Sequence, residues 1–275
     1  MFKDLSQESH VDLTETTYTV QSWGTDRQRS IDAHGPRIKK TIQWFQSQAP
    51  LNVTDKYLDV GAGVGVLIHY LAQDYSINQN SISAVEPVEA IAKLLQDTYH
   101  DIDVHNTDIE QLDTEILGRQ IDSVFCFGVD YLFKDLTRAF RIIKSLIRDG
   151  GRLMISRNVF LNMPCFFGGV PIRSFDQLVK PNPLISVYMF PDQYLEFVGR
   201  WFKVTGNVVA EERYPQGATY DPGSGKRVPI AEQVNGKTVL LDCSVDHSHK
   251  QLSKPILKPE QGRGVLGNLG AQILS

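Results

Sequence analysis

The sequence contains no long hydrophobic run, which argues against a membrane-spanning helix. None of its 275 residues lies in a segment that approaches the roughly 20 consecutive apolar residues a span requires. The first residues, MFKDLSQESHVDLTETTYTV, are polar and acidic and lack an apolar stretch of signal-peptide length. We therefore expect a cytoplasmic protein without a membrane partner.

Cysteine and clustered metal ligands are also scarce. Cys126, Cys165 and Cys243 lie far apart, form no C-x-x-C pair, and would leave one cysteine over if two formed a disulfide. The pair His247 and His249 supplies too few ligands for a metal ion. We therefore expect reduced thiols, two of them buried in strands, and no bound metal.

An excess of positive charge is absent. The chain has 28 Lys and Arg against 32 Asp and Glu, a formal net charge of -4. A protein that binds duplex nucleic acid needs a basic face to neutralise phosphates, so no nucleic-acid partner is expected. The composition, 41% hydrophobic and 22% charged, is typical of a globular protein. The length favours one large α/β domain with additions.

Strand and helix patterns alternate over about a hundred residues. Strands are expected at residues 56–60, 81–87, 101–108, 121–128 and 151–159, and the helices between them at 65–75, 88–99 and 136–147. This alternation is typical of a Rossmann-like doubly wound sheet of parallel strands with helices on both faces. Two later strands, at 203–212 and 236–245, are expected to extend the sheet, the C-terminal one antiparallel.

Three further segments flank or interrupt this core. Residues 1–50 form an N-terminal arm and helix, expected to act as a lid on cofactor and substrate, and residues 51–245 form the main domain. Within it, residues 160–191 are rich in Pro, Gly and aromatics and are expected to form a cap insert after the fifth strand. Residues 246–275 are expected to be an extended tail unless a partner, or the neighbouring subunit of a homodimer, holds them.

Three glycines stand where the first strand enters its helix, in KYLDVGAGVGVLIHY. Gly61, Gly63 and Gly65 remove side chains there, so a ligand could touch the backbone and face the helix amides. A nicotinamide or flavin site expects G-x-G-x-x-G, whose third glycine would fall at Val66. Asp59 would repel a pyrophosphate but attract a ligand that carries an ammonium and a sulfonium. This charge pattern indicates S-adenosyl-L-methionine.

The motif LDVGAGVG resembles the first motif of the class I S-adenosylmethionine-dependent methyltransferases, and the resemblance continues in order over roughly residues 55 to 160. It implies that Glu86 binds both ribose hydroxyls, as an acid also does in NAD-binding folds, and that Asp108 and Ile109 contact the adenine. The cofactor-binding residues it implies are Asp59, Gly61, Ala62, Gly63, Gly65, Glu86, Pro87, Asp108, Ile109, Phe127 and Gly128.

Each of the three acids also has a structural interpretation. Asp59 could serve as a capping or structural acid, and Glu86 could be an exposed strand end. Asp108 could cap the turn that follows it, because short polar side chains favour such positions.

Methyl transfer is an in-line displacement that needs neither a metal nor a covalent residue, and a base only for some acceptors. Asp130 and Tyr131 follow the fourth strand, where open α/β sheets bind ligands, and His34 lies in the N-terminal helix. We expect these three as catalytic candidates. Alternatively, Asp130 is a solvated loop acid, Tyr131 a packing residue and His34 a structural histidine.

The acceptor is expected to be a small, partly apolar or carboxylate-bearing molecule of biosynthesis. Aromatic side chains and a guanidinium in the insert could hold it, although the same aromatics could form the core of the cap. The substrate-binding candidates are Tyr18, Trp23, Arg157, Asn158, Phe160, Arg173 and Tyr188. The acceptor atom, whether O, N or C, stays open.

Other enzyme classes fit less well. Cys165 follows a proline, as in cytosine C5-methyltransferases, but lies after the fifth strand instead of the fourth. No Asn/Asp-Pro-Pro-Tyr motif of adenine or glutamine N-methyltransferases follows the fourth strand. Three alternatives remain: a peptide or protein methyltransferase, a non-methylating protein that binds the same cofactor, and an NAD-dependent oxidoreductase, which Val66 and Asp59 oppose.

Overall fold

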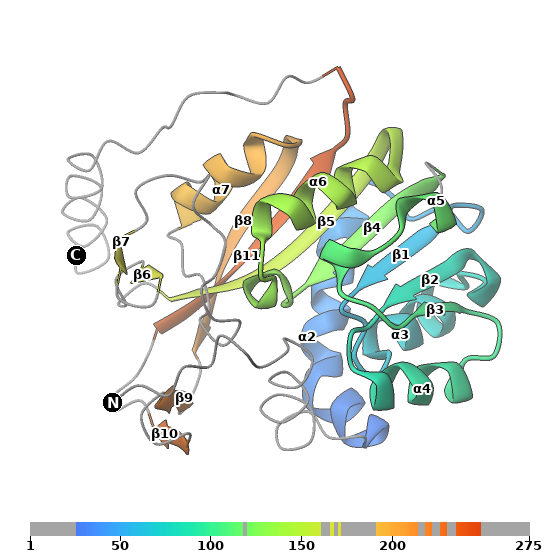
Figure 1. Ribbon diagram of the computed structural model, residues 1–275, viewed down its shortest axis with the longest axis horizontal. Helices are drawn as coiled ribbons and strands as arrows, with labels where there is room; N and C mark the ends of the chain where they lie inside the picture. The colour runs from blue at the N-terminus through green and yellow to red at the C-terminus, as the bar shows by residue number, and fades with distance from the viewer. Residues whose placement is uncertain are drawn as a thin grey trace.

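A mixed sheet forms the centre of the described chain (Figure 1). The computed structural model describes residues 26–117, 120–160, 166–167, 170–171, 191–213, 218–221, 226–229 and 235–248. Within them, seven strands pair in the order β3-β2-β1-β4-β5-β11-β8. These strands are β1 (Tyr57–Val60), β2 (Ile82–Val85), β3 (Asp103–His105), β4 (Ile121–Phe127), β5 (Ile147–Phe160), β8 (Lys203–Arg213) and β11 (Asn235–Ser244).

The strand directions confirm the predicted fold class. Strands β3, β2, β1, β4 and β5 are parallel neighbours, and β11 runs antiparallel to both β5 and β8. Two short antiparallel pairs lie outside this sheet: β6 (Phe166–Phe167) with β7 (Val170–Pro171), and β9 (Ala218–Asp221) with β10 (Lys226–Pro229). Most of the predicted cap insert, the first 25 residues and nearly all of the predicted tail lie outside the described residues.

The start of the fifth strand was predicted too late. Strand β5 begins at Ile147, directly after the preceding helix, and Gly150 and Gly151 lie inside the strand instead of before it. Gly150 has φ 72° and its N–H donates to the carbonyl of Val245 at 2.9 Å. The register between β4 and β5 shifts after Ile121. The two glycines therefore accommodate an irregularity within a strand.

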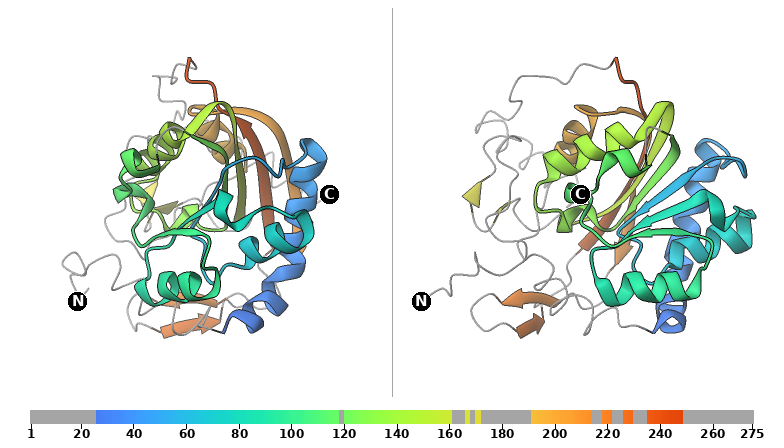
Figure 2. Two further views of the ribbon diagram at one scale, coloured as in Figure 1. Left: turned by 90° about the vertical axis from the view of Figure 1, so that its right-hand side faces the viewer. Right: turned by 45° about the vertical axis from the view of Figure 1, so that its right-hand side comes forward.

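Helices cover both faces of the sheet (Figure 2). The described helices are α2 (Arg27–Gln48), α3 (Val66–Tyr75), α4 (Glu89–Thr98), α5 (Thr114–Leu117), α6 (Leu136–Leu146) and α7 (Pro191–Gly199), with single turns η2 (Gln79–Ser81), η3 (Ile109–Gln111) and η4 (Asp130–Leu132). None of these helices combines the length and apolarity that crossing a membrane requires.

The core has one layer on each face, because successive strand residues point to opposite sides. On one face Val124 of β4 and Leu153 of β5 pack with Phe140 of α6 and Phe197 of α7. On the other face, Phe125 of β4 and Met154 of β5 pack against α2, α3 and the end of α4. The helix residues in this layer include Phe45, Ile68 and Leu95. All four residues of β1 are buried, as expected for a parallel strand covered on both faces.

The two cysteines that the structure describes, Cys126 of β4 and Cys243 of β11, are buried free thiols. Cys165 lies outside the described residues.

Helix α2 packs closely on α3 through a glycine. A Cβ atom at Gly35 would lie 2.3 Å from the hydroxyl oxygen of Tyr70, so the two helices approach too closely for a side chain there. Pro36 follows inside the helix and has no backbone N–H to donate to the preceding turn. At the start of α2, the side chain of Asp26 accepts from the N–H of Arg29 at 3.0 Å and caps the helix.

A partly buried ion pair joins the far end of α2 to the sheet. Arg152 of β5 donates to both carboxylate oxygens of Asp242 of β11, at 2.6 and 3.2 Å. Its remaining N–H groups donate to the carbonyls of Phe45 and Ala49, at 2.6 and 2.8 Å. Because Arg152 faces Ser123 near the start of β4, this ion pair lies toward the amino ends of the parallel strands.

Candidate active site

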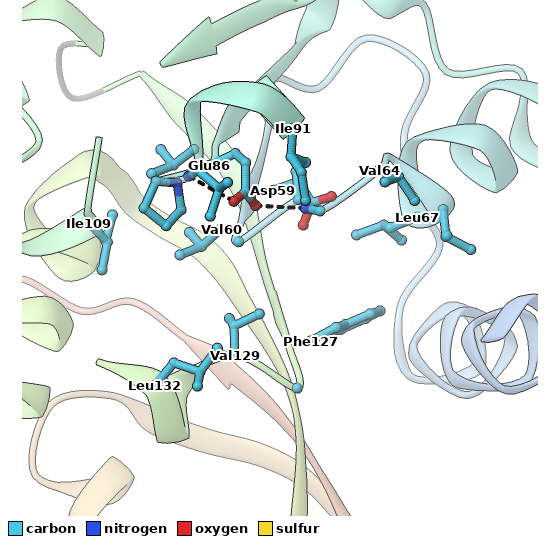
Figure 3. A pocket seen from close by; sticks show the side chains of 18 of the residues that line it. Asp59, Val60, Val64, Leu67, Glu86, Ile91, Ile109, Phe127, Val129 and Leu132 are labelled. Carbon is cyan, nitrogen blue, oxygen red and sulfur yellow. Dashed lines mark hydrogen bonds between the residues drawn. The ribbon is translucent and has the colours of Figure 1, made fainter. Parts of the chain in front are cut away.

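A cavity opens at the carboxyl ends of strands β1, β2 and β4, where open α/β sheets bind ligands (Figure 3). Its empty volume is about 1210 Å³, part of it open to solvent. The loops after these strands line it together with α2 and α4, and most of the lining is apolar: Ile38, Val60, Val64, Leu67, Val85, Ile91, Phe127, Val129, Leu132 and Phe133 are examples. The polar lining consists of His34, Arg37, Asp59, Glu86, Asp108 and Glu110.

The three glycines after β1 all have positive φ, but they serve different purposes. A Cβ atom at Gly61 would lie 2.6 Å from a methyl group of Val129, and one at Gly65 would lie 2.7 Å from the ring of Tyr99. A Cβ atom at Gly63 would meet no heavy atom of the described chain within 4 Å. Gly61 and Gly63 line the cavity, whereas Gly65 is absent from its lining. Gly63 therefore leaves room for a ligand, and Gly65 leaves room for Tyr99.

Tyr99 also holds the start of α2 near this turn. Its hydroxyl donates to the carbonyl of Gly65 at 3.0 Å and accepts from Arg27 at 2.7 Å. The guanidinium of Arg27 lies 5.1 Å from the centre of the Tyr99 ring, and one of its nitrogens lies 3.2 Å from His69. Gly65 before α3, Tyr99 after α4 and Arg27 at the start of α2 are thus linked through the Tyr99 hydroxyl.

Asp59, the acid before the glycines, is buried with one unsatisfied oxygen. Its residue is 3% exposed, and Oδ2 has no hydrogen-bond partner in the described part of the chain. Burial raises the pKa of this carboxyl to about 8, and the nearby charge of Glu86 adds to the rise. Since Asp59 also lines the cavity, a cationic ligand there would stabilise its ionised form.

Glu86, at the end of β2, is held in a fixed orientation. One of its carboxylate oxygens accepts from the N–H of Gly63 at 2.9 Å, and the other accepts from the N–H of Val88 at 3.0 Å. Burial nevertheless raises its pKa to about 7, because the cost of removing the charge from water exceeds the effect of the two amides. Figure 3 shows both hydrogen bonds and the position of Glu86 beside Asp59.

The loop after β3 supplies the next wall. Asp108 and Ile109 both line the cavity, and burial raises the pKa of Asp108 while Lys134 opposes the rise. Two residues of this loop were missed by the sequence analysis. Asn106 donates to the carbonyls of Glu86 and Pro87, and Glu110 accepts from the backbone N–H groups of Lys134 and Asp135.

Helix α2 presents two basic side chains to the cavity. His34 and Arg37 both line it, three residues apart and therefore on one face of the helix. Burial and the charge of Arg37 lower the pKa of His34, which favours the neutral imidazole at pH 7. Arg37 was not predicted, although its spacing from His34 could have indicated it. Of the catalytic candidates, His34 is the one whose side chain the structure describes at the cavity.

Asp130 and Arg157 require a correction to their expected roles. They do not line the cavity but form a buried ion pair with each other, and their residues are each 1% exposed. Tyr194 of α7 donates to the same carboxylate oxygen of Asp130 at 2.6 Å. Asp130 therefore lacks the access to substrate that a general base needs, and Arg157 is not available to bind an acceptor.

The remaining site predictions divide into three groups. Ala62, Pro87, Phe127 and Gly128 line the cavity, and their contact with a cofactor stays a prediction. Tyr131, Asn158 and Phe160 lie in described elements, but their side chains are outside the description. Tyr18, Trp23, Arg173 and Tyr188 lie outside the described residues altogether and stay predictions.

The raised pKa of Asp59 predicts a change of stability with pH. An unfolded Asp ionises near a pKa of about 3.9, whereas the folded carboxyl ionises near a pKa of about 8. Between these values the folded protein holds a proton that the unfolded chain has lost, so the free energy of unfolding falls as the pH rises and levels off above the folded pKa. Asp59→Asn removes this penalty. We expect calorimetry to give the variant a melting temperature that gains about 8 °C or more on the wild type between pH 5 and pH 8.5, because roughly three pH units at about 1.4 kcal/mol each change the free energy of unfolding by about 4 kcal/mol. An equal difference at the two pH values would contradict the assigned pKa.

Comparison with known proteins agrees with the fold and the glycine turn. Residues 58–153 match a family model described as a methyltransferase domain. A search of curated proteins found no match.

Solved structures with the same fold share little sequence identity. The MccD protein has a TM-score of 0.55 at 10% identity and covers 77% of this chain and 98% of its own. The [4+2]-cyclase SpnF has a TM-score of 0.51 at 14% identity, with coverage of 76% and 81%. A phosphoethanolamine N-methyltransferase 2 from Haemonchus contortus, in complex with phosphomonomethylethanolamine and S-adenosylhomocysteine, has a TM-score of 0.56 at 13% identity, with coverage of 87% and 60%. Residues 58–153 are therefore similar to a methyltransferase domain, and the order of the parallel strands agrees with the Rossmann-like fold of the solved structures.

Proposed function

We propose that the protein transfers a methyl group from S-adenosylmethionine to a small-molecule acceptor. The observation that carries this proposal is the buried carboxylate of Asp59, which has one unsatisfied oxygen and lies in the lining of the cavity. A buried carboxylate oxygen without a partner costs free energy, and a cationic ligand would remove that cost.

The residues of the cavity fit this cofactor. Asp59 is complementary to its ammonium and sulfonium groups, and the open space at Gly63 lets the ligand approach the backbone. Glu86 already has its two oxygens oriented by amides, so it is prepared to accept the two ribose hydroxyls. Asp108 and Ile109 suit the adenine amino group and ring. Arg37, from α2, is complementary to the carboxylate of the methionine part.

The bound cofactor would supply an electrophilic methyl group on a positively charged sulfur. The chain's contribution is to hold the acceptor in line with that methyl group and to keep water away, and the apolar lining from Val129, Leu132 and Phe133 supports this. His34 is the group suited to remove a proton from a hydroxyl acceptor, because its lowered pKa favours the neutral imidazole.

A small acceptor is supported by the concave, mostly apolar site. The phosphoethanolamine N-methyltransferase of the same fold was solved with a small phosphorylated amine, and a similar size class is proposed for this chain. A second candidate follows from the cyclase of the same fold: a protein that binds the cofactor and catalyses a different reaction. A nicotinamide-dependent oxidoreductase is disfavoured because Asp59 would repel a pyrophosphate.

Binding of S-adenosylhomocysteine tests the cofactor site. Calorimetry should detect binding to the wild type and none of NADH. Asp59→Asn and Glu86→Gln should each weaken binding at least about tenfold, because each removes a charge that faces a ligand donor. Glu89→Gln is the matched control, since this exposed acid lies at the start of α4 and does not line the cavity, and its affinity should stay within about twofold of the wild type. Failure of the wild type to bind at millimolar concentration would falsify the proposed function.

Transfer of label from methyl-labelled cofactor tests the acceptor class. The purified protein, incubated with cell extract that has been separated into small-molecule and macromolecular fractions, should label a compound of the small-molecule fraction. His34→Asn should reduce the rate while leaving the affinity for S-adenosylhomocysteine unchanged, if the acceptor is a hydroxyl. Label in the protein fraction would instead favour a peptide or protein acceptor. Binding of S-adenosylhomocysteine without any labelled product would favour the second candidate.

A further inference from the structure

A charged cluster is buried beside the cavity, on the face of the sheet that α6 and α7 cover. Asp130 accepts from Arg157 at 2.5 Å and from Tyr194 at 2.6 Å, both through one oxygen, while its other oxygen has no partner among the described residues. The guanidinium of Arg157 lies 4.6 Å from the centre of the Tyr194 ring. We call these three residues the buried triad. They come from three separate elements: η4, β5 and α7.

The buried triad is costly to maintain, so stability alone does not account for it. Arg157 is among the largest fully buried side chains of the protein, and burial raises the pKa of Tyr194 well above its usual range. Removing two charges from water costs several kcal/mol that their mutual attraction barely offsets, and apolar side chains of similar size often serve stability as well or better. What a buried, hydrogen-bonded pair adds is a fixed relative position of the elements it joins.

The element that the buried triad fixes is the cavity wall after β4. Asp130 begins η4, and the cavity is lined by Val129, directly before it, and by Leu132, two residues after it. The N–H of Leu132 donates to the carbonyl of Val129 at 2.8 Å, so a backbone hydrogen bond closes the turn around Asp130. Val129 in turn packs against Gly61, whose missing Cβ atom would lie 2.6 Å from it. A displacement of Asp130 would therefore reach the glycine turn through Val129.

We propose that Asp130, Arg157 and Tyr194 are positioning residues that hold the segment Gly128–Phe133 against the glycine turn and so set the shape of the cofactor cavity. This inference rests on the proposed function, because it assigns the cavity to the cofactor. It also gives α7 a part in the site, since Tyr194 joins that helix to the cavity wall.

Two variants and a matched control test the inference. Tyr194→Phe removes one hydrogen bond to Asp130 and keeps the ring, and Asp130→Asn removes the charge that faces Arg157. Asp242→Asn is the control, because it breaks a comparable Arg–Asp pair on the same strand β5 that lies toward the amino ends of the strands, away from the cavity. For each protein, thermal unfolding, hydrogen exchange of the peptide that spans residues 128–133, and the affinity for S-adenosylhomocysteine are measured.

Loss of a hydrogen bond to a charged group should increase local opening of the 128–133 segment about tenfold in Tyr194→Phe and in Asp130→Asn. The same variants should bind S-adenosylhomocysteine about fivefold or more weakly. The control should lower the melting temperature while leaving the exchange of this segment and the affinity within about twofold of the wild type.

The possible outcomes separate the inference from the proposed function. Unchanged exchange of residues 128–133 and unchanged affinity in a folded Tyr194→Phe variant would overturn the inference and leave the proposed function intact. An equal effect of the control on exchange and affinity would also overturn it, because the buried triad would then act only through global stability. If the wild type itself does not bind S-adenosylhomocysteine, the proposed function fails, and the exchange result alone decides whether the buried triad fixes the segment.

Discussion

A buried carboxylate with an unsatisfied oxygen is the constraint on which the site depends. Asp59 lies on the central strand β1, which is buried along its whole length, and only 3% of the residue is exposed, so its charge is poorly hydrated there. The neighbouring Glu86 adds to the penalty instead of relieving it. Strongly perturbed acids of this kind are concentrated at functional sites. The free-energy cost of burying Asp59 is therefore consistent with the proposed cationic ligand, which would offset it.

The surroundings of Asp59 are built by packing between elements that are distant in the sequence. Gly65 makes room for Tyr99, Gly35 makes room for Tyr70, and Gly61 makes room for Val129. Each missing side chain brings a helix or loop close to the glycine turn. Of the three glycines in the turn, Gly63 is the one that leaves space the described chain does not fill. Two glycines of the turn therefore allow close packing of neighbouring side chains, and Gly63 leaves space for a ligand.

The sequence predicted the parallel half of the fold and the position of the glycine turn with its acid after the first strand, because both depend on neighbours along the chain. The pattern of apolar residues marks the strands and helices. Asp59 and the three glycines lie within seven residues of each other, so the motif can be recognised in the sequence. The sequence placed Asp130 and Arg157 at the ends of strands, but it could not show which face of the sheet each side chain would lie on. Arg157 lies on the same face as Leu153 and Ile155, by the two-residue period of β5, and Tyr194 comes from a later helix. That contact is tertiary, so no local pattern indicates it.

The most direct measurement of the central claim is the proton balance of ligand binding. Calorimetry of S-adenosylhomocysteine binding at pH 7, repeated in buffers of different ionisation enthalpy, reports how many protons are released. If the ligand's ammonium requires ionised Asp59, whose pKa in the free protein is about 8, then close to one proton should be released and the affinity should rise from pH 6 to pH 8. Binding that releases no proton and does not change over this range would contradict the account.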